Sequence, residues 1–327
     1  MGRKPKGKSS SKGLKGALLR HQATEQAQKK VKTKQEHALQ KNKPTKASLE
    51  QRASQREAAE KMIPFDKNST LLLVGEGDLS FARSIIMQEY VKPENLLVTS
   101  FDNSPSELKL KYPKSFEANY DFLLENGVKV FFRIDATNLI KAFKISKKTT
   151  WSKIAGSEWA IKPVEFILFN FPHTGKGVKD QDKNIRDHQE LILGFLESCK
   201  QFFKTANQVP TSRSAMGFAQ GYTLDDDATN TRLSAEGCGK VLISVFTGEP
   251  YDSWQIKILA RTTGWKVERS SKFNWANYPE YSHRRTNSEQ DTTKPAAERE
   301  ARTYMFEIFD KHAKTARKQK NSDSDDE

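Results

Sequence analysis

The stretch Gly75 to Asp78, with the sequence GEGD, places two glycines and two carboxylates directly after the apolar run Leu71 to Val74. Glycine permits a tight turn and lets a ligand approach the backbone closely. The two carboxylates would repel a pyrophosphate but attract a cation such as an ammonium or sulfonium group. A tight turn without a ligand needs the same glycines, so the stretch alone leaves a ligand site and a structural turn equally open.

Two further carboxylates follow apolar runs in the same way. Asp102 comes after the run Leu96 to Phe101, and Asp135 after the run Val128 to Ile134. In an open α/β sheet, ligands bind at the carboxyl ends of the strands, where an acid can meet a ribose diol or a purine amino group. Each aspartate could instead cap a turn. Three strand ends that share one pattern favour a cofactor that carries a nucleoside.

Short apolar runs alternate with segments of helical period from about residue 63 onward, which is typical of βαβ units on a mainly parallel sheet. Ser104 to Glu107 forms a capping box, and apolar residues at helical spacing predict a long helix around 185–203. No long helix separates the last two runs, so the last strand is expected to be antiparallel. The runs are Leu71 to Val74, Leu96 to Phe101, Val128 to Ile134, Val164 to Asn170, Lys240 to Phe246, Trp265 to Phe273 and Thr303 to Phe309.

The predicted fold class is therefore α/β, of the Rossmann-like class I methyltransferase type, with seven mostly parallel strands and an antiparallel last strand. Within this frame the two acids of the glycine turn favour S-adenosylmethionine over a nicotinamide dinucleotide, because they complement a cation. Three polar segments, residues 143–161, 205–238 and 284–300, are interpreted as inserted loops.

The segment VEFILFNFPHTGKG, residues 164–177, ends its strand in Asn170, Phe171, Pro172 and His173. Beside a methyl donor, an aromatic ring can stack an extruded base, and an amide can orient a ring nitrogen. Methylation of a pyrimidine carbon normally needs a cysteine nucleophile, and none lies near this loop, so nitrogen methylation is favoured. The alternative is that Phe171 and Pro172 close the core while His173 caps a loop.

These motifs resemble one known family, the eukaryotic large-subunit ribosomal RNA uridine N(3)-methyltransferases. The matching pieces are LLLVGEGDLSFA, SFDNSPSEL, DAT at 135–137, ILFNFPHTGKG, TGEPYDSW at 247–254 and YPEYSHRR at 278–285. The resemblance implies S-adenosylmethionine as donor and pre-ribosomal RNA as substrate. It implies donor contacts from Gly75, Glu76, Gly77, Asp78, Asp102 and Asp135, and an acceptor site at Asn170, Phe171, Pro172 and His173. Further candidate donor contacts beside these are Phe81, which also belongs to the apolar stripe of the predicted helix, Asn103 and Ala136.

Residues 1–62 carry 17 Lys and Arg against 5 Asp and Glu, a net +12 of the chain's +14. We expect a largely disordered basic arm at 1–62, a methyltransferase domain at 63–310 and a charged tail at 311–327. The arm suits phosphate backbones and nuclear import, although a solubilising tail would look the same. The family resemblance implies a nucleolar location. Rings and cations mix in YPEYSHRR, which suits single-stranded RNA or an exposed loop equally. The candidate RNA contacts are Lys176, Tyr278, His283, Arg284 and Arg285.

Cys199 and Cys238 lie far apart and show no zinc-ligand spacing, so no metal site and no disulfide framework are expected. No apolar stretch has the length of a membrane span, and no membrane partner is expected. Two other functions compete with the methyltransferase. One is a noncatalytic, RNA-binding ribosome-assembly factor on the same fold. The other is a nicotinamide-dependent oxidoreductase, which Glu76 and Asp78 disfavour.

Overall fold

The computed structural model describes residues 63–207, 233–234, 237–286 and 295–309, together with His21, Glu25, Gln26, Lys29 and Lys30. The chain divides into two units, residues 1–58 and 59–327. Of the first unit only those five residues are described, and they are helical, with Lys29 3.5 Å from Glu25. Most of the predicted basic arm, the whole charged tail and most of the segment 205–238 lie outside the described residues.

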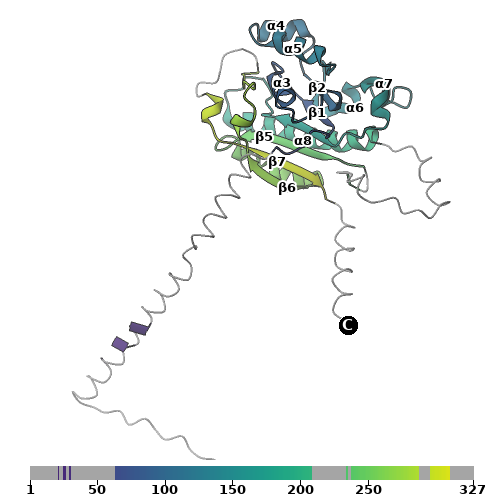
Figure 1. The fold of residues 1–327 in the computed structure, drawn as a ribbon. Helices are drawn as coiled ribbons and strands as arrows, with labels where there is room; N and C mark the ends of the chain where they lie inside the picture. The colour runs from purple at the N-terminus through teal and green to yellow at the C-terminus, as the bar shows by residue number, and fades with distance from the viewer. Residues whose placement is uncertain are drawn as a thin grey trace, which may run out of the picture. The chain divides into compact units, whose positions relative to one another are not determined.

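One seven-stranded sheet in the order β3-β2-β1-β4-β5-β7-β6 organises the second unit (Figure 1). Strands β1 to β5 pair in parallel, and β7 runs antiparallel to both of its neighbours. The predicted class, seven mostly parallel strands with a reversed last strand, is confirmed. The strands are β1 (Leu71–Val74), β2 (Leu96–Thr99), β3 (Lys129–Phe131), β4 (Phe166–Asn170), β5 (Lys240–Phe246), β6 (Trp265–Lys272) and β7 (Ala301–Ile308).

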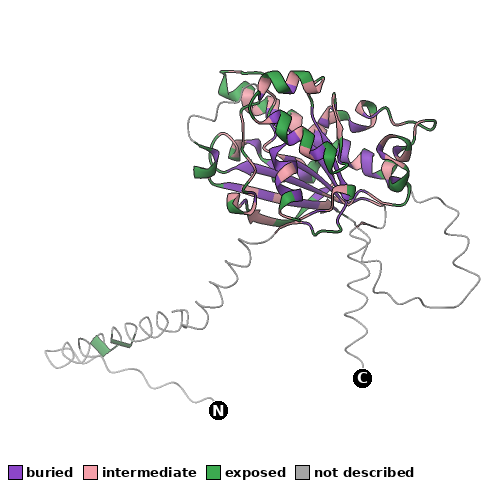
Figure 2. Cartoon of the chain, turned by 45° about the horizontal axis from the view of Figure 1, so that its top comes forward, coloured by how far each residue is buried: buried purple, intermediate pink, exposed green. Residues whose placement is uncertain are grey.

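Helices cover both faces of this sheet, which explains why its central strands are apolar throughout. In β1, Leu71 and Leu73 pack on one face while Leu72 and Val74 pack on the other. Figure 2 shows the result, buried strands between helices whose outer surfaces are exposed. The α-helices are α3 (Ser80–Met87), α4 (Pro105–Lys111), α5 (Phe116–Glu125), α6 (Leu139–Ala142), α7 (Trp151–Ala155), α8 (Gln181–Ala206) and α9 (Ile256–Thr262).

Short 3-10 turns complete the connections between these elements. They are η1 (Pro93–Asn95), η2 (Ala136–Asn138), η3 (Ser157–Ala160), η5 (Asp252–Trp254), η6 (Trp275–Asn277) and η7 (Ala296–Glu298).

The capping box after β2 forms as predicted. Ser104 Oγ accepts the backbone N–H of Glu107 at 3.3 Å, and the Glu107 carboxylate accepts the backbone N–H of Asn103 at 2.9 Å. These two bonds satisfy backbone donors at the start of α4. They fix the direction in which the chain leaves the end of β2, and therefore the position of Asp102 and Asn103.

The interpretation of residues 143–161 as a polar loop is wrong. This segment folds into α7 and η3, and its two tryptophans, Trp151 and Trp159, are each 3% exposed. The Trp151 ring packs edge-on against Phe143 and Phe202, at centroid distances of 5.2 and 4.8 Å. A few aromatic anchors thus outweigh the many lysines of the segment, because each buries a large apolar area.

Candidate functional site

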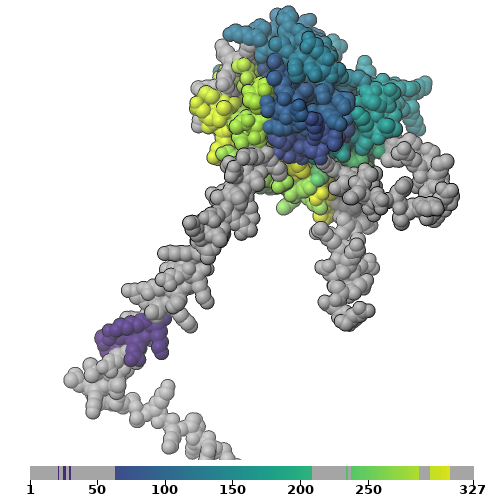
Figure 3. Space-filling model, viewed as in Figure 1, coloured from purple at the N-terminus to yellow at the C-terminus, as the bar shows by residue number. Residues whose placement is uncertain are grey.

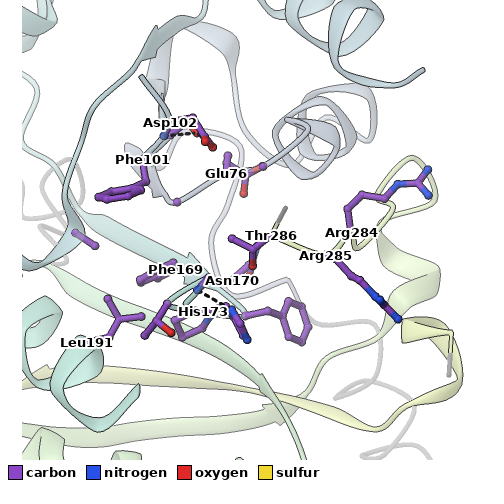
Figure 4. Close-up of a pocket in the computed structure, with 18 of the residues that line it drawn as sticks. Glu76, Phe101, Asp102, Phe169, Asn170, His173, Leu191, Arg284, Arg285 and Thr286 are labelled. Atoms are coloured by element: carbon purple, nitrogen blue, oxygen red, sulfur yellow. Dashed lines mark hydrogen bonds between the residues drawn. The ribbon is translucent and has the colours of Figure 1, made fainter. Parts of the chain in front are cut away.

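A cavity of about 1550 Å³ lies at the carboxyl ends of the parallel strands. Its walls come from the segments that follow β1, β2, β3, β4 and β5, joined by residues 281–286 from the connection between β6 and β7. Figure 4 shows Glu76 and Asp102 on one wall, with Asn170 and His173 across the cavity from them. The parallel topology therefore brings together the strand ends that the sequence singled out.

The glycine turn after β1 requires glycine for a steric reason at Gly75. This residue has φ +73°, and a Cβ there would lie 2.5 Å from Cε2 of Phe169 on β4. At Gly77, a Cβ would lie 3.2 Å from the Tyr112 hydroxyl oxygen. The backbone of the turn therefore passes close to Phe169 on one side and Tyr112 on the other, and it lines the cavity between them.

Glu76 is a buried carboxylate, 8% exposed, and no cationic side chain among the described residues pairs with it. Its backbone N–H is fixed by the Thr99 carbonyl at 2.9 Å. Burial, with the neighbouring Asp78 charge, raises the pKa of Glu76 from 4.5 to about 8. A buried acid without a counter-charge, lining a cavity, fits a cationic ligand group.

Asp78 caps helix α3 within the wall of the cavity. Its Oδ1 accepts both the N–H and the hydroxyl of Ser80, at 3.1 and 2.6 Å, and its Oδ2 accepts the Ser115 hydroxyl at 2.9 Å. Its carboxylate therefore ties the glycine turn to α3 and α5. The Asp78 charge helps to raise the pKa of Glu76, and the Asp78 hydrogen bonds hold the turn in position.

The donor role implied for Phe81 does not fit the structure. Its side chain is 1% exposed and does not line the cavity. Its ring packs against those of Tyr278 and Tyr281, with centroids 4.9 and 5.3 Å away. Phe81 faces the core because it lies on the apolar stripe of α3, so it supports the turn from behind.

The ends of β2 and β3 form the adjoining wall. Asp102 pairs with Lys111, and its Oδ2 lies 3.4 Å from the Ser100 hydroxyl. Asn103, Asp135 and Ala136 line the cavity as expected. Asp135 caps η2 as well, since its Oδ1 accepts the N–H and hydroxyl of Thr137 at 2.8 and 2.7 Å. Asp135 therefore caps a turn and lines the cavity at the same time.

Phe101 and Arg133 also line this wall and were missed by the sequence analysis. Phe101 is 71% exposed, which is unusual for a phenylalanine in a folded domain. Arg133 has φ +62°, a strained conformation outside glycine, and its N–H donates to the Asp102 carbonyl at 2.9 Å. An aromatic residue directly before the acid that ends a strand is the signal that could have identified Phe101.

Asn170 ends β4 in the floor of the cavity with its amide unsatisfied. Both Oδ1 and Nδ2 are buried, and neither has a hydrogen-bond partner among the described residues. Buried amides without partners are rare in native proteins and cost about 1 to 3 kcal/mol. The Asn170 side chain thus offers one acceptor and one donor to a ligand.

Phe171 follows with φ +47° and donates its N–H to the Ser244 carbonyl at 2.7 Å. Its ring packs 5.5 Å from Trp275, nearly parallel at 12°, and 4.6 Å from Phe246. The ring lines the cavity, and Pro172 beside it is buried. The strained backbone of Phe171 turns the chain so that Asn170 and His173 both face the cavity.

His173 is held as a neutral ring with a defined tautomer. Its Nδ1 accepts the Gly175 N–H at 2.9 Å, so the ring proton lies on Nε2. The residue as a whole keeps an exposed surface, but partial burial of its ring, together with nearby His188, lowers the pKa of His173 to about 4. At neutral pH this side chain is a hydrogen-bond donor and not a cation.

His188 on α8 supports the same loop. Its Nδ1 lies 2.7 Å from the Asn184 carbonyl, and its Nε2 accepts the Thr174 N–H at 3.4 Å. The ring is 1% exposed and stacks on Trp254 with centroids 4.4 Å apart. Burial lowers the pKa of His188, so both imidazoles are neutral and position the loop through its backbone amides.

Residues 281–286 cross one side of the cavity as a strap. The Tyr112 hydroxyl donates to the carbonyls of Arg285 and Thr286 at 2.9 and 3.1 Å, and the Ser282 N–H donates to Ser80 Oγ at 3.2 Å. Figure 3 shows the C-terminal part of the domain lying against the first strand-and-helix segment. The strap thus joins the donor-side turn to the aromatic wall.

Four of the five candidate RNA contacts line the cavity, and Tyr278 does not. Tyr278 is 6% exposed and packs between Phe81 and Phe273, so its ring is unavailable for stacking on RNA. That expectation was wrong because packing of the aromatic cluster buries the ring. The other four are Lys176, His283, Arg284 and Arg285. Lys176 lies 3.3 Å from Asp187, and Arg284 lies 3.8 Å from Asp78. The His283 ring contacts the Tyr281 hydroxyl at 3.1 Å.

Two kinds of feature are absent from the described part of the chain. Within it, no group of three or more His, Cys, Asp or Glu side chains is arranged to hold a metal ion. None of its helices has the length and apolar character that a membrane crossing requires.

The chain is similar in sequence to known proteins and, more distantly, to solved structures. The chain is 50% identical over 341 aligned positions to a 25S rRNA (uridine(2634)-N(3))-methyltransferase of Saccharomyces cerevisiae, covering 99% of this chain and 100% of the relative. An uncharacterized Arabidopsis thaliana protein, At4g26485, is 26% identical over 76% of this chain and 98% of its own. The solved structure of TrmK of M. capricolum with S-adenosyl-homocysteine is 8% identical, covers 78% of this chain and 67% of its own, and has a TM-score of 0.33.

The sequence family described as "BMT5-like: rRNA (uridine-N3-)-methyltransferase BTM5-like" matches residues 72–285. That range contains the glycine turn, the strand ends and the Asn170 loop, which together form the cavity. This chain belongs to the BMT5-like rRNA (uridine-N3-)-methyltransferase family.

Proposed function

We propose that this protein methylates N3 of a uridine in large-subunit ribosomal RNA, with S-adenosylmethionine as methyl donor. The observation that carries the proposal is the buried Asn170 amide, whose donor and acceptor both lack partners among the described residues. One acceptor beside one donor complements the N–H and adjacent C=O of a uracil imide. Family membership and the yeast relative's named activity support the same assignment.

The donor side has the groups that S-adenosylmethionine needs. Glu76 lacks a cationic partner among the described residues and suits an ammonium or sulfonium, while Asp102 at the end of β2 suits a ribose diol. Phe101, exposed beside Asp102, can stack on a purine. When bound, S-adenosylmethionine supplies an electrophilic methyl group on a sulfonium.

The acceptor side can hold an extruded base and stabilise its anion. N3 of uracil becomes nucleophilic when it loses its proton to water in the open cavity, and the negative charge then spreads onto the two carbonyl oxygens. Asn170 Nδ2–H and the neutral His173 Nε2–H are both donors in the cavity and can stabilise that charge. Because Nδ1 of His173 is engaged by Gly175, we assign His173 the role of donor and not of base.

Pre-ribosomal particles are the proposed setting for this reaction, and the nucleus, with the nucleolus, is the proposed location. A basic N-terminal segment with a net charge of +12 over residues 1–62 supports both. Accessible, single-stranded rRNA is more abundant during assembly than in the finished particle, and base extrusion is easiest from such RNA.

The test is nucleoside mass spectrometry of large-subunit rRNA from cells that lack this protein. Cells complemented with the wild type should contain 3-methyluridine, and cells complemented with Asn170→Ala should not, at equal protein levels. An unchanged nucleoside profile in the deletion would refute the uridine assignment. Normal ribosome assembly with Asn170→Ala would separate catalysis from the role of a noncatalytic assembly factor.

A further inference from the structure

We propose that Arg299 and Tyr251 form a phosphodiester subsite that anchors the RNA strand beside the extruded nucleotide. The proposal rests on the proposed function, since it assumes a single-stranded RNA substrate at the same cavity. Neither residue was among the RNA contacts expected from the sequence. Both line the cavity.

Arg299 is a half-buried cation without an acidic partner in the described part of the chain. Its guanidinium lies 3.6 Å above the Phe246 ring, and its Nη2 donates to the Tyr251 hydroxyl at 2.9 Å. The ring and the hydroxyl fix the guanidinium in place but leave its charge uncompensated. A guanidinium held in this way has further N–H groups for the oxygens of a phosphate.

Arg299 lies at the acceptor end of the cavity, on the far side of β4 from the glycine turn. Arg299 lies two residues before β7, whose first residue, Ala301, pairs with Phe246 at the end of β5. The Arg299 guanidinium lies over Phe246 at the end of β5, and in the sheet order β5 is separated from β1 by β4, so about two strand spacings of about 4.8 Å separate the guanidinium from the glycine turn. The donor turn and Arg299 therefore lie on opposite sides of Asn170.

The distance from the base site fits one nucleotide. Asn170 ends β4, the Arg299 backbone leads into β7 two strand spacings away, and the guanidinium lies over Phe246 on β5 between them, so Asn170 and the guanidinium are on the order of 5 to 10 Å apart. A base seated over Asn170 has its sugar and phosphate at about this range. The Phe246 ring, which contacts both Phe171 and Arg299, forms the continuous wall between the two positions.

Tyr251 positions the guanidinium and completes the subsite. Its ring centroid lies 5.3 Å from the Arg299 guanidinium carbon and 4.9 Å from the Trp254 ring, so Trp254 holds it in place. The hydroxyl that receives the Arg299 N–H still has its own proton to donate to a phosphate oxygen. The subsite therefore combines one fixed positive charge with one neutral donor.

The experiment measures binding of a short, labelled, uridine-containing single-stranded RNA to the full chain as a function of salt, by fluorescence anisotropy. We expect Arg299→Met, which keeps the apolar stem, to weaken RNA binding about tenfold and to reduce the slope of log K against log salt by about 1. Arg299→Lys should keep the slope, and Tyr251→Phe should weaken binding less than Arg299→Met does. Affinity for S-adenosylmethionine should not change in any of them.

Arg302→Gln is the matched control, because it removes a positive charge from β7 whose guanidinium contacts Ser270 outside the cavity. Equal RNA affinity and equal salt slope in Arg299→Met and Arg302→Gln would overturn the proposal. So would unchanged RNA binding with a lower methyl-transfer rate in Arg299→Met, which would place the cation at the base anion. Thermal melting of Arg299→Met checks that this variant is folded. If Arg299→Met does not fold, the salt slope of Arg299→Lys compared with that of the wild type tests the subsite instead.

Failure of the proposed function gives a different pattern. A wild type that binds RNA with the expected salt slope but transfers no methyl group to it would refute the methyltransferase and support the phosphate subsite. A wild type that does not bind single-stranded RNA would refute both.

Discussion

Gly75 faces the edge of the Phe169 ring so closely that a Cβ on Gly75 would lie 2.5 Å from Cε2 of Phe169. This contact joins the turn after β1 to the strand that ends in Asn170, so the donor side and the acceptor side share one packed boundary. A change at Gly75 therefore disturbs both halves of the cavity.

Gly75→Ala should lose donor binding and destabilise the fold, and Gly127→Ala is the matched control. The two glycines have nearly the same φ, +73° and +74°, but a Cβ at Gly127 meets nothing within 4 Å. We expect Gly127→Ala to cost about 1 kcal/mol through φ alone, and Gly75→Ala to cost about 3 kcal/mol or more. Chemical denaturation and calorimetric titration with S-adenosylmethionine measure the two effects. Equal losses of stability in the two variants would contradict the clash between a Cβ at position 75 and the Phe169 ring.

Glu76 should make both stability and donor binding depend on pH. Its folded pKa, about 8, lies above the ordinary value of 4.5, so the free energy of unfolding falls as pH rises from about 4.5 to about 8. Glu76→Gln removes this loss and should stabilise the ligand-free protein at pH 8, by on the order of 4 kcal/mol. Denaturation curves across this pH range measure the difference.

The same carboxylate should release a proton when the cationic donor binds. Wild-type affinity for S-adenosylmethionine is expected to rise with pH up to about 8 and then level off, while Glu76→Gln binds weakly at every pH. Glu165→Gln is the control, since that half-buried acid accepts from Thr70 and does not line the cavity. A flat wild-type profile would show that Glu76 does not contact the cation.

Asn170 and Asn207 should respond oppositely to the same substitution. The Asn207 amide is fully bonded, with Oδ1 accepting from Val164 and Nδ2 donating to Val164 and Gly237, whereas the Asn170 amide is unsatisfied. Asn170→Leu should raise stability by about 1 kcal/mol and Asn207→Leu should lower it by about 3 kcal/mol. Asn170→Leu should also reduce methyl transfer about 10²-fold or more. A destabilised Asn170→Leu would mean that its amide already has a structural partner.

His173 should act without titrating near neutral pH. Because the pKa of His173 is lowered to about 4, His173 should not change its charge between about pH 5 and 8. The pH dependence of the methyl-transfer rate over this range should therefore have the same shape in the wild type and in His173→Gln. His173→Ala, which removes the Nε2–H donor that glutamine would partly replace, should lower kcat by about 10² and leave the shape of the profile unchanged. A limb near the ordinary histidine value that vanishes in the variant would make His173 a base instead.

The sequence predicts the sheet well because most strands are short apolar runs that end at a turn residue or an acid, although β6, WKVERSSK, is largely polar and exposed. Lys240–Phe246 is recovered residue for residue, and β7 is reversed as expected from the missing crossover helix. The segment 143–161 was misread because four lysines with several serines and threonines interrupt its apolar residues, while Phe143, Trp151 and Trp159 bury their rings in the core.

The site was harder to predict where exposure decides a residue's role. Phe81 and Tyr278 look like ring contacts in the sequence but are buried, whereas Phe101 looks like the last residue of an apolar strand but is exposed. Arg299 and Tyr251 lie 48 residues apart and meet only through the pairing of β5 with β7. A contact of this kind cannot be predicted from the local sequence around either residue.

The central claim is methyl transfer to N3 of uridine at the cavity floored by Asn170. The most direct test incubates the purified full chain with isotope-labelled S-adenosylmethionine and large-subunit rRNA from cells that lack the protein, followed by nucleoside mass spectrometry. We predict labelled 3-methyluridine with the wild type and none with Asn170→Ala. Label in another nucleoside, equal label with Asn170→Ala, or no label at all despite donor and RNA binding would contradict it.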